Sequence, residues 1–199
     1  MISAFRIFYR ALELWWKDFI SLTLINIIWA LLQIPIITGP PATAAVYAIT
    51  RQIADEELME PGYAWIAFRQ NFWHAWKWGL ANLVIFAVLL WNYWAYQNAA
   101  GIAYTVLRLA WGLITFLWFT ANVYYWPFWM AQDQKSFWLT LKNCFQFIYK
   151  RPALALGLGF ICAITFSASS LIVIPLISFA ITWISLIGVL AVDLETNKT

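Results

Sequence analysis

Five long apolar runs divide the chain. A membrane-spanning helix needs about 20 consecutive, predominantly apolar residues, and each run comes close to or exceeds that length. The runs therefore predict long spans or near-spans, and the third is so long that it must tilt or leave the membrane at one end. They cover residues 19–37, 79–96, 102–130, 152–174 and 176–192.

Shorter stretches with two distinct faces lie between these runs. In the first stretch Phe5, Phe8 and Leu12 recur at helical spacing, while Arg6 and Arg10 recur on another face. This period predicts an amphipathic helix that lies in the membrane interface with its apolar side toward the lipid. The same arrangement of aromatic and polar faces returns twice. The three predicted interfacial helices cover residues 3–17, 64–78 and 136–150.

The most distinctive passage follows the first apolar run, at Gly39-Pro40-Pro41. Two adjacent prolines remove two backbone donors and clash with the preceding turn, so one helix must stop there. Pro41 is well placed to open the next helix, over residues 41–54, in which small residues such as Thr43 allow close helix packing. We expect a short return helix whose start offers free N–H groups and the positive end of a dipole at membrane depth. Such broken helices line sites in transporters, but they also occur simply as tight hairpins.

The predicted elements form three groups, each with an amphipathic helix followed by a helical hairpin. Residue identity between the groups is poor, so we interpret the repeat as architectural rather than ancestral. The groups lie near residues 1–57, 62–131 and 136–193, within a single integral membrane domain over residues 1–199. The expected fold is all-α: a polytopic transmembrane helical bundle of five long spans plus the short return helix.

Composition agrees with this fold class. The chain is 64% hydrophobic and 11% charged, whereas soluble domains are roughly 45–50% apolar and about 25% charged. The net charge of +3 comes from residues between the apolar runs, which favours an anionic membrane surface over nucleic acid as a partner. Cys144 and Cys162 lack metal-ligand spacing and are expected to be buried thiols. We expect no metal and no cofactor.

Charge also predicts the topology. If the helix after Pro41 returns through the membrane, the two termini share one side with the connections at residues 51–78 and 131–151. That side then carries every basic residue except Arg108. Basic residues gather on the cytoplasmic side of membrane proteins, so both termini are expected to be cytoplasmic.

No catalytic constellation is evident. His74 has no Ser, Cys or carboxylate placed by spacing to work with it, and a solvated histidine explains it. We therefore expect a protein that is not an enzyme. Small residues at four-residue spacing in the fourth apolar run predict a helix-packing stripe. The stripe consists of Ala155, Gly159, Ala163 and Ser167.

Arg108 is the one ionisable residue well inside a predicted span, and such residues often mark functional sites. Alternatively, it reaches the membrane interface or pairs with carbonyl groups at a helix end. Aromatic and amide residues also lie together in two spans, a combination that suits a sugar-like ligand, although an interfacial belt and core packing explain it too. The candidate ligand-binding or partner-binding residues are Gly39, Pro40, Pro41, Thr43, Arg51, Trp91, Asn92, Arg108 and Asn122.

The passage from Thr38 to Tyr47, the pair Thr50-Arg51 and the aromatic helix at residues 68–77 resemble the YesL family, a domain of unknown function. The resemblance implies a small, multi-pass protein of the bacterial plasma membrane, often encoded beside carbohydrate ABC transporters. It supplies no catalytic residues. That family more often has Gly-Pro-Ala at the turn, so Pro41 predicts a longer turn here.

Two functions are compatible with these features. The first is an accessory or interaction protein that associates with the permease subunits of a carbohydrate ABC transporter, consistent with the absence of carboxylates within the spans. The second is a small autonomous transporter or channel for a small, sugar-like solute, with the broken helix and Arg108 lining a path. The expected partners are the lipid bilayer, permease subunits and a second copy of the chain, and no nucleic acid.

Overall fold

The computed structural model describes residues 2–57, 61–172 and 175–196, which form helices and connecting turns without any strand. The all-α fold predicted from the sequence is confirmed. In chain order the elements are α1 (Ile2–Lys17), α2 (Phe19–Gln33), α3 (Gly39–Ala54), α4 (Pro61–Gln70), α5 (Phe72–Ala95), α6 (Ile102–Ala131), α7 (Phe137–Lys150), α8 (Pro152–Ile172), the π-helical turn η1 (Leu176–Ala180) and α9 (Ile181–Thr196).

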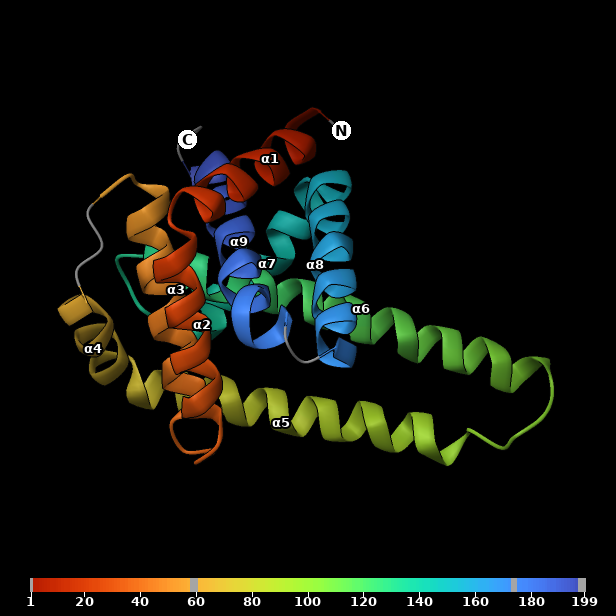
Figure 1. Ribbon diagram of the computed structural model, residues 1–199. Coiled ribbons are helices and arrows are strands. Elements are labelled where there is room, and N and C mark those ends of the chain that lie inside the picture. Colours follow the sequence, from red (N-terminus) through yellow and green to blue (C-terminus); the bar gives the residue numbers. More distant parts are fainter. Residues whose placement is uncertain (1, 58–60, 173–174, 197–199) are drawn as a thin grey trace.

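Helices α3 and α9 pack against each other and together contact most of the other helices. In Figure 1, α3 lies beside α2 and α4, and α9 lies between α3 and α8. Most residues of both helices are buried. In α3 the buried residues are largely small, from Ala42 through Ala48, so neighbouring helices can approach its backbone closely. Helix α1 lies across the end where α9 terminates, while the α5–α6 hairpin extends sideways, away from α2, α3 and α9 (Figure 1).

Four helical segments in the described residues are long and apolar enough to cross a membrane. They are Phe72–Ala95, Ile102–Ala131, Pro152–Ile172 and Ile177–Thr196. The first predicted span is shorter than expected: α2 has 15 residues, because it ends at Gln33, just before Pro35. Together α1 and α2 would pass as a fifth span, but a bend of 91° separates them.

One predicted interfacial helix differs from the structure. The amphipathic stretch at residues 64–78 is divided at Asn71 between α4 and α5, and the Asn71 side chain donates a hydrogen bond back to the Ala67 carbonyl at 2.9 Å. Helix α6 agrees with the predicted run over residues 102–130 and continues through Pro127 to Ala131. Because Pro127 has no N–H, the carbonyl of Val123 lacks its usual helical partner, and it accepts the Tyr47 hydroxyl at 3.4 Å instead.

Candidate functional site

The Gly-Pro-Pro turn is held in place by the first half of α5. The indole N–H of Trp76 donates a hydrogen bond of 2.9 Å to the carbonyl of Ile37. Gly79 faces Pro40, and a Cβ atom at Gly79 would lie 2.7 Å from the ring of Pro40. Only glycine therefore permits this approach of α5 to the start of α3. The turn also places Ile36 at a φ of 56°, which is unfavourable for a β-branched residue.

The start of α3 offers no free N–H groups, contrary to our expectation from the sequence. The helix begins at Gly39, two residues earlier than expected. The N–H of Gly39 donates to the carbonyl of Ile36 at 3.1 Å, and the N–H of Ala42 donates to that of Thr38 at 2.9 Å. The two prolines between them have no N–H to offer. Residues 39–42 therefore have no free N–H group to offer an anionic ligand.

A cavity of about 400 Å³ lies beside this helix start. Its volume falls within the range of small-molecule sites. Six elements contribute to it, so residues from distant parts of the chain meet there. The lining consists of Trp29, Gln33, Gly39, Pro40, Thr43, Tyr47, Trp78, Gly79, Asn82, Phe86, Phe119, Asn122, Val123, Phe166, Ile181 and Ile184.

Hydrogen bonds fix most polar side chains of the cavity. The Thr43 hydroxyl accepts the Trp29 indole N–H at 3.0 Å and donates to the carbonyl of Gly39 at 3.1 Å. The side-chain oxygen of Asn82 accepts the Trp118 indole N–H at 2.9 Å, which ties α5 to α6. Every lining residue is apolar or an uncharged polar residue. The walls are thus mainly apolar and include six aromatic side chains, with a few amide and hydroxyl groups.

Four of the candidate residues from the sequence meet in this cavity: Gly39, Pro40, Thr43 and Asn122. Pro41 is buried in the first turn of α3 but is not part of the lining. Trp91 and Asn92 lie on the part of α5 that extends away from the other helices. The structure therefore places four of the candidate residues at the cavity and separates Trp91 and Asn92 from them.

Arg108 lies near the tip of the α5–α6 hairpin, not in the cavity. Its guanidinium donates hydrogen bonds to the carbonyl of Ala99 at 2.7 Å and to that of Tyr104 at 3.3 Å. This is one of the two alternatives that we considered for Arg108, pairing with carbonyl groups at a helix end. In this position Arg108 holds the connection between α5 and α6.

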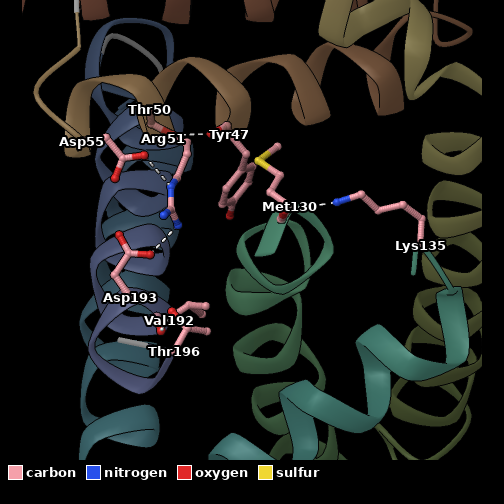
Figure 2. A network of polar contacts seen from close by, with 9 residues as sticks. All are labelled: Tyr47, Thr50, Arg51, Asp55, Met130, Lys135, Val192, Asp193 and Thr196. Carbon is pink, nitrogen blue, oxygen red and sulfur yellow. Dashed lines mark hydrogen bonds and ion pairs between the residues drawn. The ribbon is translucent and has the colours of Figure 1, made fainter. Parts of the chain in front are cut away.

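Arg51 lies at the opposite end of α3 from the cavity, between two carboxylates (Figure 2). It forms an ion pair with Asp55, with 2.8 Å between Nε and Oδ2, and a second one with Asp193 of α9. A further ion pair joins Arg151 to Glu195, at 2.6 Å. These contacts tie the end of α9 to α3 and to the start of α8.

Lys135 stabilises the end of α6 close to this network (Figure 2). Its ammonium group donates to the carbonyls of Trp129 at 2.7 Å and Met130 at 3.1 Å, which have no partner within the helix. Burial lowers the pKa of Lys135 below its usual value, against the opposing effect of the Asp133 charge. Its role in this structure is that of a helix cap.

Replacing Arg51 by glutamine is expected to destabilise the protein by about 1–2 kcal/mol, because Asp193 loses its cationic partner. The Asp193 side chain is only 16% exposed, so hydration of the unpaired carboxylate offsets little of this loss. Thermal denaturation in detergent would measure the effect. Arg6→Gln is the matched control, because Arg6 is exposed on α1. Equal midpoints for the two variants would contradict a structural role for the Arg51 pairs.

The first half of the helix-packing stripe predicted on α8 packs against α6. Ala155 and Gly159 are buried, and a Cβ atom at Gly159 would lie 2.5 Å from the hydroxyl oxygen of Thr120 on α6. The Tyr124 hydroxyl donates to the carbonyl of Ala155 at 2.8 Å in the same interface. Ala163 is half-buried and Ser167 is exposed.

Sequence reasoning missed several residues of the cavity, among them Trp29, Gln33 and Asn82. Trp29 and Gln33 are four residues apart and thus share a face of α2, which is a detectable signal. Asn82 is a polar residue in an apolar run, like Asn122, and the same criterion applies to it. Nothing local in the sequence indicates that these faces meet.

Long apolar helices around a buried core define a polytopic α-helical membrane protein. Residues 22–93 match the family described as "Protein of unknown function, DUF624". The match spans α2, α3, α4 and most of α5, including the Gly-Pro-Pro turn, and it confirms the resemblance to a family of unknown function over these residues. Neither the curated proteins nor the solved structures contain a match to the chain.

Proposed function

We propose that this protein is an accessory membrane protein of carbohydrate uptake, which binds the membrane-spanning subunits of a carbohydrate ABC permease. The α5–α6 hairpin carries the proposal. It extends away from the other helices (Figure 1), and large apolar side chains such as Leu90, Trp91 and Leu109 are more than 60% exposed along it. The resemblance to a family often encoded beside such transporters supplies the choice of partner.

The composition of the hairpin favours a protein partner in addition to lipid. Trp91, Tyr93 and Trp94 lie together near its end, each about 60% exposed or more, and exposed Trp and Tyr are typical of binding hot spots. The tip is also stiffened by the bond from Arg108 to Ala99. A rigid aromatic surface loses little conformational entropy when it binds a neighbouring helix.

The proposal includes a bacterial plasma membrane location with both termini in the cytoplasm. The ion pairs of Arg51, Arg151 and Arg10 connect α1, α3, α8 and α9. They join groups that the predicted topology places on one side of the membrane. The positive-inside tendency then favours the cytoplasm for that side.

The first test is extraction at native expression level in a gentle detergent, followed by mass spectrometry of the proteins that co-purify. We expect permease subunits in stoichiometric yield. A protein that emerges alone, or only with copies of itself, would contradict a stable complex.

The hairpin surface is tested by the double variant Trp91→Ala/Trp94→Ala. We expect at least about a tenfold loss of co-purified permease, since hot-spot residues commonly contribute that much or more. The matched control is Trp73→Ala/Trp138→Ala, because these residues are both 76% exposed and lie outside the hairpin end. Equal yields from both double variants would place the contact elsewhere.

An autonomous transporter for a small, sugar-like solute is the second candidate, and the cavity beside α3 is the observation that favours it. Because Arg108 lies outside this cavity, Asn122 is the better residue for a test. Purified protein in liposomes should then take up sugar, and Asn122→Leu should reduce uptake. Absence of uptake would leave the accessory role.

A further inference from the structure

We propose that the cavity between α2, α3, α5, α6, α8 and α9 binds an uncharged amphiphile, with one or two hydroxyl groups on an apolar body. This inference goes beyond the accessory role and does not depend on it. It rests on the charge of the lining, on two unused hydrogen-bond acceptors, and on the balance between apolar and polar surface.

The lining excludes a charged ligand. It contains no Asp, Glu, Lys, Arg or His. An ionised group in such surroundings would be buried without a partner, at a high cost in free energy. Arg51 is not part of the lining, and its guanidinium is already paired with Asp55 and Asp193 (Figure 2). Fatty acids, phosphates and amines are therefore poor ligands for this cavity.

Two amide side chains present acceptors to the cavity. The Gln33 side-chain N–H donates to the carbonyl of Trp29 at 3.2 Å, and the Asn122 side-chain N–H donates to that of Trp118 at 2.9 Å. These bonds orient both amides. Among the described residues nothing donates to Gln33 Oε1 or Asn122 Oδ1. A fitting ligand must bring donors, and a hydroxyl group is the simplest uncharged donor.

The balance of surfaces favours an amphiphile over a free sugar. A sugar ring carries about five hydroxyl groups, and each one left unpaired in apolar surroundings weakens binding substantially. The cavity offers two free acceptors and one unpartnered donor, the buried indole N–H of Trp78, to which a hydroxyl oxygen can bind. Most of its lining residues are apolar, and several carry large rings. Trp29, Trp78, Phe86 and Phe119 are among them. Such walls stabilise an apolar body through burial.

The test uses a monoacylglycerol with a photoreactive diazirine in its acyl chain. Monoacylglycerol is uncharged and has two hydroxyl groups. The full-length protein in phosphatidylcholine nanodiscs is irradiated with the probe, and labelled peptides are mapped by mass spectrometry. We expect labels on the lining segments of α2, α5 and α6. Unlabelled monooleoylglycerol should compete, whereas oleate and glucose should not.

Asn122→Leu should lower the labelling of these peptides about tenfold, because it removes an acceptor and retains the size of the side chain. Asn92→Leu is the matched control. Asn92 makes the same type of bond to the carbonyl four residues before it, at 2.8 Å, but lies outside the cavity. Gln33→Leu provides a second variant in case Asn122→Leu does not fold. Thermal midpoints in the same nanodiscs report on folding.

Several outcomes would overturn the proposal. Labels spread evenly over lipid-facing helices would mean that the probe only partitions into the bilayer. Equal labelling of the folded variants Asn122→Leu, Gln33→Leu and Asn92→Leu would show that the two amide acceptors do not bind the probe. Competition by glucose would identify a sugar site, and competition by oleate would contradict the selectivity for uncharged ligands.

Discussion

Replacing Gly188 by alanine is expected to lower the free energy of unfolding by about 1–3 kcal/mol, the usual cost of overpacking a core. For a chain of this size, this corresponds to a fall of roughly 3–10 °C in the thermal midpoint. A Cβ atom at Gly188 would lie 2.5 Å from the carbonyl oxygen of Val123 and 3.3 Å from the ring of Pro127. Helices α9 and α6 would have to separate.

The steric clash of a Cβ atom at Gly188 is difficult to relieve, because the obstacle is a backbone atom. The Val123 carbonyl has no helical donor, since Pro127 lacks an N–H, and it accepts the Tyr47 hydroxyl instead. Moving α6 away from Gly188 therefore also disturbs the contact with α3. The three central helices are coupled at this point, and one methyl group affects all of them.

Gly157→Ala is the matched control. Gly157 also lies in a helix, but a Cβ atom there has no heavy atom within 4 Å. We expect its midpoint to stay close to that of the unmodified protein. Both variants can be compared by thermal denaturation in one detergent. If Gly188→Ala behaves like Gly157→Ala, the close contact between α6 and α9 is incorrect.

The helices were predictable from the sequence because each depends on local signals. The runs predicted to end at residues 37 and 96 stop at a proline or at a turn, although α2 already ends at Gln33, and their hydropathy indicates the spans. An interruption in this region followed from the properties of proline, but its position was wrong: α2 ends at Gln33, before Pro35, and Pro40 and Pro41 lie in the first turn of α3. Pairing of Arg108 with carbonyl groups at a helix end was among the alternatives, since a guanidinium near a helix end in an apolar environment must reach the interface or bind such carbonyls.

The cavity was not predictable, because it depends on packing between elements. Gln33 and Asn122 come from α2 and α6, and no local pattern indicates that their amides lie at the same cavity. The absence of free N–H groups at the start of α3 was missed for a similar reason. The carbonyls of Ile36 and Thr38 fold back onto the helix start, a detail of the turn that composition does not reveal.

Replacing Asn26 by leucine is expected to destabilise the protein by about 1–3 kcal/mol, because a buried backbone N–H loses its partner. Asn26 is fully buried in α2, and its side-chain oxygen accepts the N–H of Thr182 at 3.1 Å. Thr182 lies in the first turn of α9, directly after the π-helical turn, which locally interrupts the regular α-helical hydrogen-bond pattern.

The site around Thr182 joins three helices. Besides the bond to Asn26, the Thr182 hydroxyl accepts the Trp15 indole N–H of α1 at 3.2 Å and donates to the carbonyl of Phe179 at 3.1 Å. Leucine at position 26 keeps the volume of the side chain but provides no acceptor. The irregular start of α9 should then open more often, which hydrogen exchange of peptides from this segment would detect.

Two measurements separate this local effect from general destabilisation. In Asn26→Leu, exchange should accelerate first at the start of α9, while the buried middle of α3 stays protected. Asn92→Leu makes the same substitution at a half-buried position on the hairpin and should leave both segments unchanged. If Asn26→Leu exchanges like the unmodified protein, the N–H of Thr182 has another acceptor, and the π-helical turn does not depend on α2.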